Sequence, residues 1–191
     1  MLRRLIRVKY QKLIYALCAM LALIVIAFVH HPHLSANAKD AQNGKLIVSL
    51  INAKNEEMGT AKLSETAKGV RIELEAEGLT PGIHAIHFHE YGSCTPPDFM
   101  SAGAHFNPEN KKHGLKNPMG PHAGDMVNIF ADRHGHVKTV LFNSMVTLKE
   151  GEPNSLRDAD GSALIIHEKG DDQVTDPSGN SGDRILCGVI K

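Results

Sequence analysis

Histidines and one carboxylate gather in a single stretch of this sequence, residues 84–125. The stretch contains six of the twelve histidines of the chain. Clusters rich in imidazole nitrogen suit zinc or copper, whereas calcium and magnesium prefer oxygen ligands. Much of the stretch is rich in Gly, Pro and Asn, which favour loops, and a loop of this length needs something to order it. The sequence therefore predicts a metal site, built from among His84, His87, His89, His105, His113, His122 and Asp125.

The end of the stretch can form a closed metal site. His113, His122 and Asp125, with one further histidine, would give four ligands in a tetrahedral arrangement. Structural zinc is held in this way, with no position left for a substrate. The spacing is thus compatible with a structural zinc at these residues.

A more open imidazole set can form from the start of the stretch and a later segment. His87 and His89 stand two apart in an alternating run, so their rings project from one face of a strand. His167, from another strand, would complete a set suited to copper. Spacing alone does not assign His105 to either set.

The elements that must position these residues are short strands. Alternating or β-branched apolar runs, separated by turn residues, recur along the chain after residue 44, and no amphipathic helix appears there. Asp132 to Gly135 is a typical hairpin connection. We expect an all-β fold, an eight-stranded antiparallel Greek-key barrel or sandwich with two long functional loops. Nine segments are candidates for these roughly eight strands: 45–53, 59–65, 70–77, 83–90, 126–131, 136–142, 145–148, 162–167 and 184–190.

The parity of the segment with the first histidines indicates which of them face the core. Ile86 and Phe88 are apolar and share one face with His84, whereas His87 and His89 share the opposite face. We therefore expect His84 to be a hydrogen-bonded core residue, and His87 and His89 to lie on the outer surface.

The N-terminal segment has the charge order of an export signal. Residues 1–12 carry five basic residues and no acid, and the 17 residues 13–29 are apolar. A small-residue cleavage pattern at 36–38 divides the chain into a signal, residues 1–38, and a domain, residues 39–191. The alternative is an uncleaved membrane anchor at residues 13–29. The domain would then be periplasmic, extracellular or anchored on the outer face of the cytoplasmic membrane.

Charge excludes some partners of the exported domain. Without residues 1–38 it has 16 basic and 21 acidic residues, because all five charges lost are positive. A net negative domain is a poor match for nucleic acid or for an anionic membrane. Its 153 residues suit one domain with an ordinary core.

The exported domain retains two cysteines, Cys94 and Cys187. An even pair in an oxidising compartment is most simply a disulfide, which here would remove roughly 4–5 kcal/mol of unfolded-state entropy. A thiolate metal site is the alternative, less favoured because neither cysteine belongs to a CxxC pair.

Six motifs in order carry a family resemblance: HAIHFHEYGSC, SAGAHFNP, KKHG, PHAGD, IIHEKGDD and SGDRILCGVI. Together they resemble the copper/zinc superoxide dismutase family in its bacterial, exported type, over nearly all of residues 45–190. The resemblance implies two metals that share His105 as a bridge. Copper would be held by His87, His89, His105 and His167, and zinc by His105, His113, His122 and Asp125.

The same resemblance implies roles for residues near the metals. Asp171 would tie a copper histidine to a zinc histidine, Arg184 would hold the anionic substrate, and the disulfide Cys94–Cys187 would pin the loop to the last strand. Copper would cycle between two oxidation states while superoxide becomes dioxygen and hydrogen peroxide, and His105 would supply protons. Zinc would only fix His105 and the loop. Because the domain is acidic, a local positive charge at Arg184 must guide superoxide.

Two other functions fit the set of candidate ligand residues less well. A dismutase-like protein that binds copper and zinc without turnover would lack a copper ligand or the arginine, and a zinc-stabilised scaffold would lack the copper set. This sequence keeps both sets. The loop between His167 and Arg184 departs from the family pattern in being short, with Lys169 and few other bases. The loop after Cys94 also departs, in a region that sets subunit contacts in the family, so a homodimer is allowed rather than implied.

Overall fold

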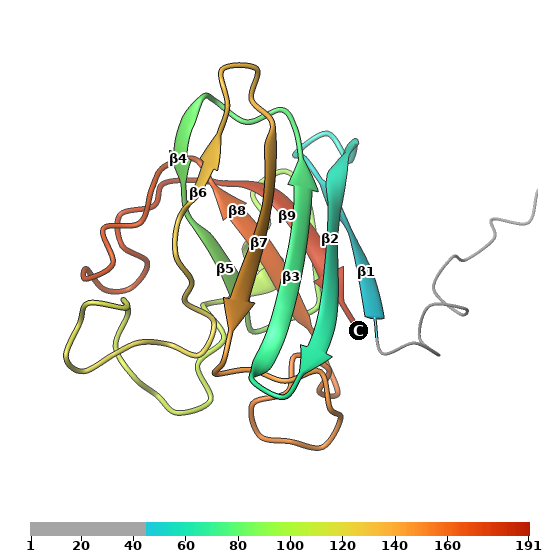
Figure 1. Ribbon diagram of the computed structural model, residues 1–191. Coiled ribbons are helices and arrows are strands. Elements are labelled where there is room, and N and C mark those ends of the chain that lie inside the picture. The colour runs from blue at the N-terminus through green and yellow to red at the C-terminus, as the bar shows by residue number, and fades with distance from the viewer. Residues whose placement is uncertain (1–44) are drawn as a thin grey trace, which may run out of the picture. The chain divides into compact units, whose positions relative to one another are not determined.

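The structure is a computed structural model that describes residues 45–191, and the predicted signal or anchor lies outside them. Nine strands make up the fold in these residues (Figure 1), with one 3₁₀ turn, η2 (Met100–Ala102), as the only helical element. The strands are β1 (Lys45–Ile51), β2 (Glu57–Thr66), β3 (Gly69–Ala76), β4 (Gly82–His84), β5 (Ile86–His89), β6 (Ile129–Ala131), β7 (Val137–Asn143), β8 (Ser162–His167) and β9 (Arg184–Ile190). Within residues 45–191, no helix has the length and apolar character needed to span a membrane.

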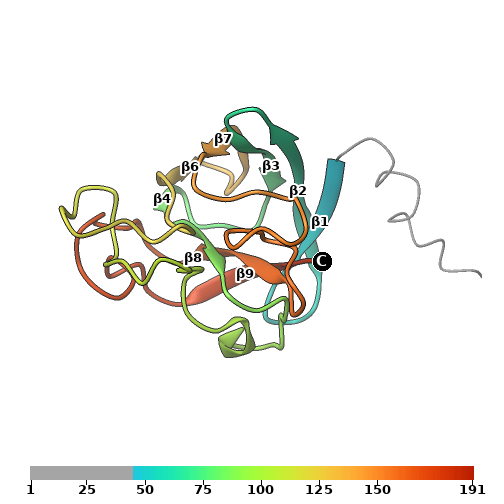
Figure 2. The same cartoon turned by 90° about the horizontal axis from the view of Figure 1, so that it is seen from below.

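Seven strands form one curled antiparallel sheet in the order β5–β8–β9–β1–β2–β3–β7, and β4 pairs with β6 in a second, two-stranded sheet. Because β4 runs into β5 and β6 turns into β7, this pair completes the wall between the two ends of the large sheet (Figures 1 and 2). Non-consecutive neighbours such as β3 and β7 require connections of the Greek-key type. The predicted all-β antiparallel fold is confirmed.

The main core fills the inside of the curled sheet. Strand β3 supplies Val70, Ile72 and Leu74, all buried, while the residues between them point outward. This alternation is the two-residue period of a strand with one face in the core.

Strand β8 is different because both of its faces are buried. Leu164 and Ile166 belong to the main core, whereas Ala163 and Ile165 pack outside it against Phe99 and the disulfide. The continuous apolar run of β8 follows from this position, since a loop covers its outer face.

Two strand predictions need correction. The segment 83–90 is two strands, because Ala85 exchanges main-chain hydrogen bonds with His167 and Lys169 instead of continuing either ladder. The segment 145–148 forms only an isolated bridge between Thr147 and Ser155. On either side of Thr147, side chains accept the backbone N–H groups: Asn143 Oδ1 accepts that of Met145 at 2.8 Å, and the Glu65 carboxylate accepts that of Leu148 at 2.7 Å.

The predicted turn at Asp132 to Gly135 is present, and the Asp132 carboxylate accepts the backbone N–H groups of His134 and His136 at 2.8 and 3.0 Å. The strands on either side belong to different sheets, however, because β6 pairs with β4 and β7 pairs with β3. The turn therefore forms a corner of the barrel.

Candidate metal centre

Backbone pairing around β5 brings the histidine-rich loop to the sheet. The Phe88 N–H donates to the Gly124 carbonyl at 2.9 Å, and the Phe88 carbonyl accepts the Phe106 N–H at 2.8 Å. Isolated bridges consequently join His87 to Asp125 and His89 to His105. The loop thus runs beside β5 and places its ligand-type side chains over the outer face of the sheet.

His87 and His89 lie on the predicted face of β5 but are not at the molecular surface. They are 0% and 1% exposed, because the loop that carries His105 and the loop that follows β8 cover them. The predicted face of the strand is therefore correct, but the predicted exposure to solvent is wrong. Alternation along a strand indicates which way a side chain points, and it does not indicate whether a loop covers that side chain. His167 shares this outer face through β8, whose Ile165 pairs with His87.

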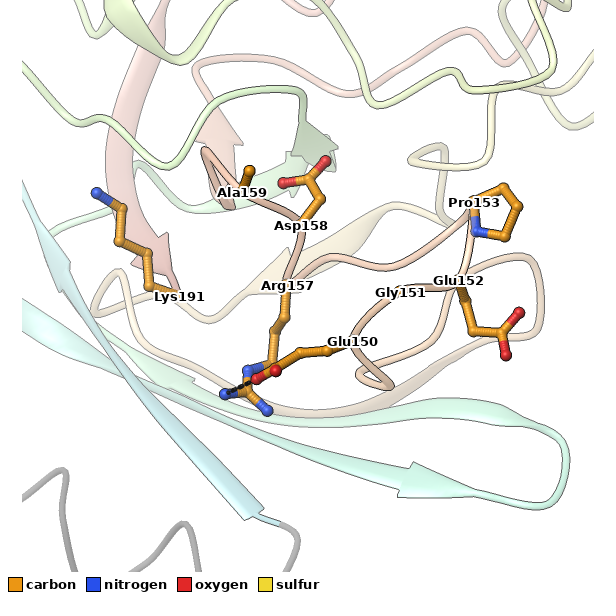
Figure 3. Close-up of a pocket in the computed structure, with 8 residues that line it drawn as sticks. All are labelled: Glu150, Gly151, Glu152, Pro153, Arg157, Asp158, Ala159 and Lys191. Carbon is orange, nitrogen blue, oxygen red and sulfur yellow. Dashed lines mark ion pairs between the residues drawn. The ribbon is translucent and has the colours of Figure 1, made fainter.

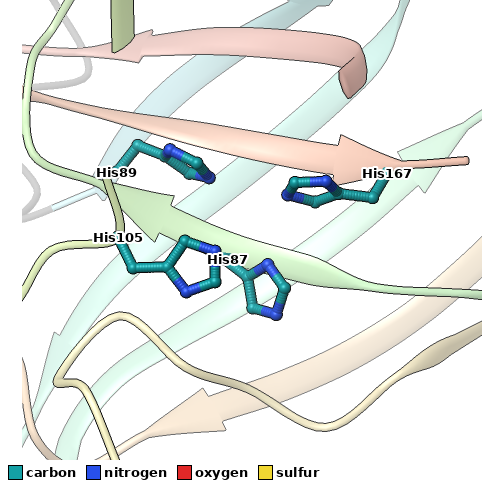
Figure 4. Close-up of side chains that lie close together, drawn as sticks. All are labelled: His87, His89, His105 and His167. Atoms are coloured by element: carbon teal, nitrogen blue, oxygen red, sulfur yellow. The ribbon is translucent and has the colours of Figure 1, made fainter. Parts of the chain in front are cut away.

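Four imidazole rings converge on the outer face: His87, His89, His105 and His167 (Figure 4). Each offers one ring nitrogen, and these nitrogens all lie within 4.8 Å of one another. One nitrogen of each ring is also buried without a hydrogen-bond partner, namely Nδ1 of His87 and Nε2 of the other three. Buried polar atoms are normally satisfied, so four unsatisfied nitrogens around one space indicate a ligand that binds them all.

The second nitrogen of each ring has a partner in every case. For His87 the partner is Asp171 Oδ2 at 3.0 Å, for His89 the Gly103 carbonyl at 3.1 Å, for His105 Asp125 Oδ1 at 2.8 Å, and for His167 the Gly182 carbonyl at 3.3 Å and Ser181 Oγ at 3.2 Å. A hydrogen bond from the second nitrogen fixes the tautomer and leaves the lone pair of the first for a metal.

The four rings are neutral at physiological pH. Burial lowers the pKa of His105 to about 3 and that of His167 to about 2, with the neighbouring imidazoles adding to the effect. Burial likewise lowers the pKa of His87 and of His89, and the positive charge of Arg184 contributes to the shift of His89. Metal binding needs neutral imidazole, so these rings are in the form that a cation requires.

A second ligand group consists of His105, His113, His122 and Asp125. Three imidazole Nδ1 atoms surround one oxygen of Asp125, at 2.8 Å for His105, 3.1 Å for His113 and 3.3 Å for His122. The Nδ1 atoms of His122 and His105 are 3.4 Å apart. Tetrahedral zinc with bonds of 2.0–2.1 Å separates its ligand atoms by about 3.3 Å, so this donor set fits zinc.

The ionisable groups of this second ligand group have strongly shifted pKa values. Burial alone would raise the pKa of Asp125, but the hydrogen bonds from its three histidine partners outweigh burial and hold that pKa far below its ordinary value. Burial opposes the charge of His113, yet its hydrogen bonds to Asp125 and Asp171 prevail and raise its pKa to about 9. The second group is therefore a charged network, unlike the neutral first group.

Asp171 links the two groups through one carboxylate. Its Oδ2 faces His87 Nε2 at 3.0 Å and its Oδ1 faces His113 Nε2 at 2.9 Å, and the Gln173 N–H donates to Oδ1 at 2.6 Å. Gly179 packs directly against this carboxylate, since a Cβ built on Gly179 would lie 1.7 Å from Oδ1. The segment after β8 thus holds a histidine of each group in place.

Arg184 begins β9 and is paired with His167 across the sheet. Its Nη1 donates to the Phe99 carbonyl at 2.8 Å and its Nη2 to the Gly103 carbonyl at 2.6 Å. Partial burial lowers the pKa of Arg184, against the charges of Asp98 and Glu90, but a guanidinium stays protonated in proteins. A fixed positive charge therefore stands beside the four-histidine group.

The loop that holds Arg184 is anchored by a second small core. The predicted disulfide Cys94–Cys187 is confirmed, and it packs with Phe99, Ala102 and Ile165. Phe99 is fully buried in the left-handed region, with φ of 55°. The sequence did not reveal Phe99 as a partner of Arg184, because its contribution is a main-chain carbonyl with no side-chain signal.

The other histidines of residues 45–191 lie outside both groups. His84 is buried as predicted, with its ring nitrogens 2.8 Å from the His167 carbonyl and 2.7 Å from the Thr80 carbonyl. His134 and His136 are exposed at the turn before β7, where His136 lies 3.6 Å from Glu77. Neither belongs to a group that could hold a metal.

An open pocket of about 580 Å³ lies away from these groups, between the loop after β7 and the C-terminal Lys191 (Figure 3). Arg157 and Glu150 form an ion pair of 2.7 Å in it, and no lining residue is a histidine or cysteine. A second open pocket, of about 560 Å³, is lined by Arg184 together with Lys54, Asp98 and Asp183. Of these two pockets, the second contacts a residue of the candidate centre, Arg184, and the first does not.

Fold and site together define a class of protein. A curled antiparallel β-barrel that carries a four-histidine group and a three-histidine, one-aspartate group, with one histidine in common, is a metalloprotein with a two-metal centre. The family model described as "Copper/zinc superoxide dismutase (SODC)" matches residues 57–190. The chain belongs to this family, whose metals are copper and zinc.

Comparisons with individual proteins and solved structures support the same family assignment. The chain is 53% identical over 156 residues to "Superoxide dismutase [Cu-Zn] 2" of Aquifex aeolicus, covering 81% of this chain and 91% of that protein. A solved double mutant of a SOD-like protein from Bacillus subtilis has a TM-score of 0.74 and 46% identity, covering 75% and 95% of the two chains. The Cu/Zn superoxide dismutase from Brucella abortus gives a TM-score of 0.64 at 29% identity, covering 77% and 99%.

Proposed function

We propose that this protein is a superoxide dismutase that converts superoxide to dioxygen and hydrogen peroxide at a two-metal centre. The four-histidine group would hold copper, and the group with Asp125 would hold zinc. His105 belongs to both groups and would bridge the metals. The proposed copper ligands are His87, His89, His105 and His167, and the proposed zinc ligands are His105, His113, His122 and Asp125; each set could hold a metal ion.

One observation carries this proposal: the four unsatisfied, buried ring nitrogens of the first group. Leaving a buried polar atom unpaired costs about 1–3 kcal/mol, so four of them around one space would be a heavy cost without a bound ion. An all-imidazole set suits copper, whereas the tetrahedral set with a carboxylate suits structural zinc.

Copper, when bound, supplies the one-electron chemistry, and zinc does not change oxidation state. The chain supplies the positioning of that chemistry. His105 directs Nδ1 toward Asp125 and Nε2 toward the other three copper ligands, so one ring reaches both sites. Its Nε2 is the position at which this ring would take up and release a proton during turnover.

Arg184 would bind the anionic substrate. Its guanidinium is fixed by two main-chain carbonyls beside the four-histidine group, which orients the remaining N–H groups without help from a carboxylate partner. Burial lowers the pKa of Arg184 overall, although the nearby carboxylates of Asp98 and Glu90 act to raise it, and residues 39–191 are net negative. A local positive charge is therefore needed to attract superoxide against the charge of the whole domain.

The setting of this activity is part of the proposal. We infer that residues 1–38 export the chain and residues 39–191 form the dismutase domain, outside the cytoplasm. A disulfide is typical of proteins in oxidising compartments, which supports export. If the N-terminal segment is retained, residues 13–29 would be the membrane contact. The net negative charge disfavours nucleic acid as a partner, and a homodimer is allowed.

The test uses purified residues 39–191 with the disulfide intact. We expect about one copper and one zinc per chain, and superoxide consumption that depends on copper. The Arg184→Gln variant should keep both metals and lose most of the activity. A copper-loaded, oxidised protein that fails to accelerate superoxide decay would contradict the proposal.

The second candidate function is a dismutase-like protein that binds copper and zinc without turnover. One similar protein carries the name "Superoxide dismutase-like protein YojM" and is 45% identical over 145 residues. This function would be supported by full metal content without superoxide consumption. All the copper ligands and Arg184 are present, which favours the enzyme.

A further inference from the structure

His167 has an additional hydrogen-bond partner that the metal ligands do not account for. The hydroxyl of Ser181 lies 3.2 Å from His167 Nδ1, and the Gly182 carbonyl lies 3.3 Å from the same nitrogen. Ser181 is 0% exposed, so its hydroxyl has no access to water. The contact joins residues 14 apart in sequence, across the loop that follows β8.

The direction of this hydrogen bond follows from the other nitrogen of the ring. Nε2 of His167 is buried, has no partner and points into the four-histidine group. It can act as a metal ligand only without a proton, so the proton of the neutral ring must be on Nδ1. His167 Nδ1–H therefore donates to Ser181 Oγ as well as to the Gly182 carbonyl.

The backbone around Ser181 is held against the end of β8. The Lys169 N–H donates to the Ser181 carbonyl at 2.8 Å, and the Glu168 N–H donates to the Asp183 carbonyl at 2.8 Å. Between them Gly182 has φ of 75°, and a Cβ there would lie 2.7 Å from the Glu168 carboxylate. The loop thus returns to the strand end in a fixed conformation that aims the Ser181 hydroxyl at His167.

We propose that Ser181 is a positioning residue for the copper centre, which fixes the ring of His167 and strengthens Nε2 as a metal ligand. This inference rests on the proposed copper site. An acceptor at the far nitrogen of a ligating imidazole makes the ring a better donor to the metal, and such partners typically change metal affinity by about 10–100-fold. Copper(II) gains more from a stronger donor than copper(I), so Ser181 also favours the oxidised metal.

The experiment compares Ser181→Ala with a matched control on the strand that carries His167. Ser162 is also 0% exposed, and its hydroxyl has no partner, so Ser162→Ala removes a buried hydroxyl without a bond to a ligand. In the metal-free protein, the ring N–H signal of His167 is followed by NMR. Copper(II) affinity and the reduction potential are then measured in the zinc-loaded protein.

We expect Ser181→Ala to shift the His167 Nδ1–H signal and to weaken copper(II) binding about tenfold, because the Gly182 carbonyl remains as acceptor. A tenfold loss for copper(II) alone raises the one-electron potential by about 59 mV. Ser162→Ala should change none of these quantities. Ser181→Thr keeps the hydroxyl and should keep the His167 signal and the affinity of the unaltered protein.

An unchanged His167 signal and copper(II) affinity in Ser181→Ala would overturn the proposal, as would Ser181→Thr behaving like Ser181→Ala. The NMR measurement needs no copper, so this outcome is separate from a failure of the proposed function. Absence of copper binding in the unaltered protein would instead contradict the four-histidine copper site itself.

Discussion

At the scale of single residues, one ring belongs to both candidate ligand groups. His105 is only 6% exposed, and its two nitrogens face different ligand groups. A ligand that belongs to one group should affect one metal first, whereas a shared ligand should affect both.

We therefore expect His105→Ala to reduce binding of both metals, and Asp125→Ala to reduce zinc binding first. Metal content after dialysis against a weak chelator, measured by mass spectrometry, checks both. His134→Ala is the control, because His134 is exposed and belongs to neither group. Loss of copper alone from His105→Ala would argue against a shared ligand.

Gly179 offers a second prediction at this scale. An alanine there would place its Cβ 1.7 Å from Asp171 Oδ1 and 2.8 Å from His113 Nε2, so the carboxylate that joins the two groups must move. We expect Gly179→Ala to weaken zinc binding by about 10–100-fold, the usual effect of disturbing the partner of a metal ligand.

Gly151 is the matched control for Gly179. It also has a positive φ, 83°, but no atom lies within 4 Å of a Cβ built on it. Gly151→Ala should therefore show only the strain of a left-handed backbone, roughly 1–2 kcal/mol of stability, and unchanged zinc affinity. Equal zinc affinities in the two variants would contradict the role of Gly179.

At the scale of elements, the loop after β8 is an ordered part of the centre. Asp172 organises its tip by accepting the backbone N–H groups of Thr175 and Val174 at 2.8 and 2.9 Å, and Asn180 Nδ2 at 2.9 Å. These bonds, with that from the Thr175 backbone the largest, lower the pKa of Asp172 to about 2 from 3.8.

This depressed pKa predicts how the stability contribution of Asp172 depends on pH. Since the folded pKa lies below the unfolded one, the contribution is present above about pH 4 and is lost as pH falls toward 2. Thermal unfolding of metal-free protein should therefore separate Asp172→Asn from the unaltered chain at pH 5, and the difference should shrink by pH 2. A difference that stays constant over this range would contradict the prediction.

Strand periodicity predicted most of the elements because most strands have one face in the main core. It failed at Ala85, where two strands with different partners read as one alternating run. It also failed at 145–148, where side chains such as that of Glu65 replace the ladder. Neither the break at Ala85 nor the missing ladder at 145–148 changes the local pattern of apolar residues. A pattern in one sequence could therefore not have shown either of them.

The site was more predictable in its side chains than in its backbone. Spacing placed His87 and His89 on one face of a strand, and the structure agrees. Assignment of His105 to two sets required the family resemblance, because its loop has no periodicity. The carbonyls of Phe99 and Gly103 that hold Arg184 stayed hidden, since every residue has a carbonyl.

At the scale of the whole molecule, the last strand lies inside the sheet. Strand β9 pairs with β8 on one side and contacts β1, the first described strand, on the other. It contributes Arg184 and Cys187, and its Leu186 and Ile190 belong to the main core.

We expect a chain that ends at Asp183 to show no cooperative unfolding transition and no stable metal binding, because β1 and β8 would both lose their neighbour. Removal of Lys191 alone, which is exposed and follows β9, should leave both properties unchanged. Calorimetry and metal analysis of the two truncated proteins test this. A folded, zinc-binding 39–183 fragment would show that β9 is dispensable.

The pairing of β1 with β9 also has a consequence for the order in which the fold and the metal centre can form. A chain is synthesised from its N-terminus, so β9 is the last strand to become available. Until β9 is available, the sheet lacks the strand between β8 and β1, and Cys94 lacks its disulfide partner. If the chain is exported as proposed, we expect stable metal capture only after β9 has joined the sheet, so the bound metals would be those of the compartment that receives the chain.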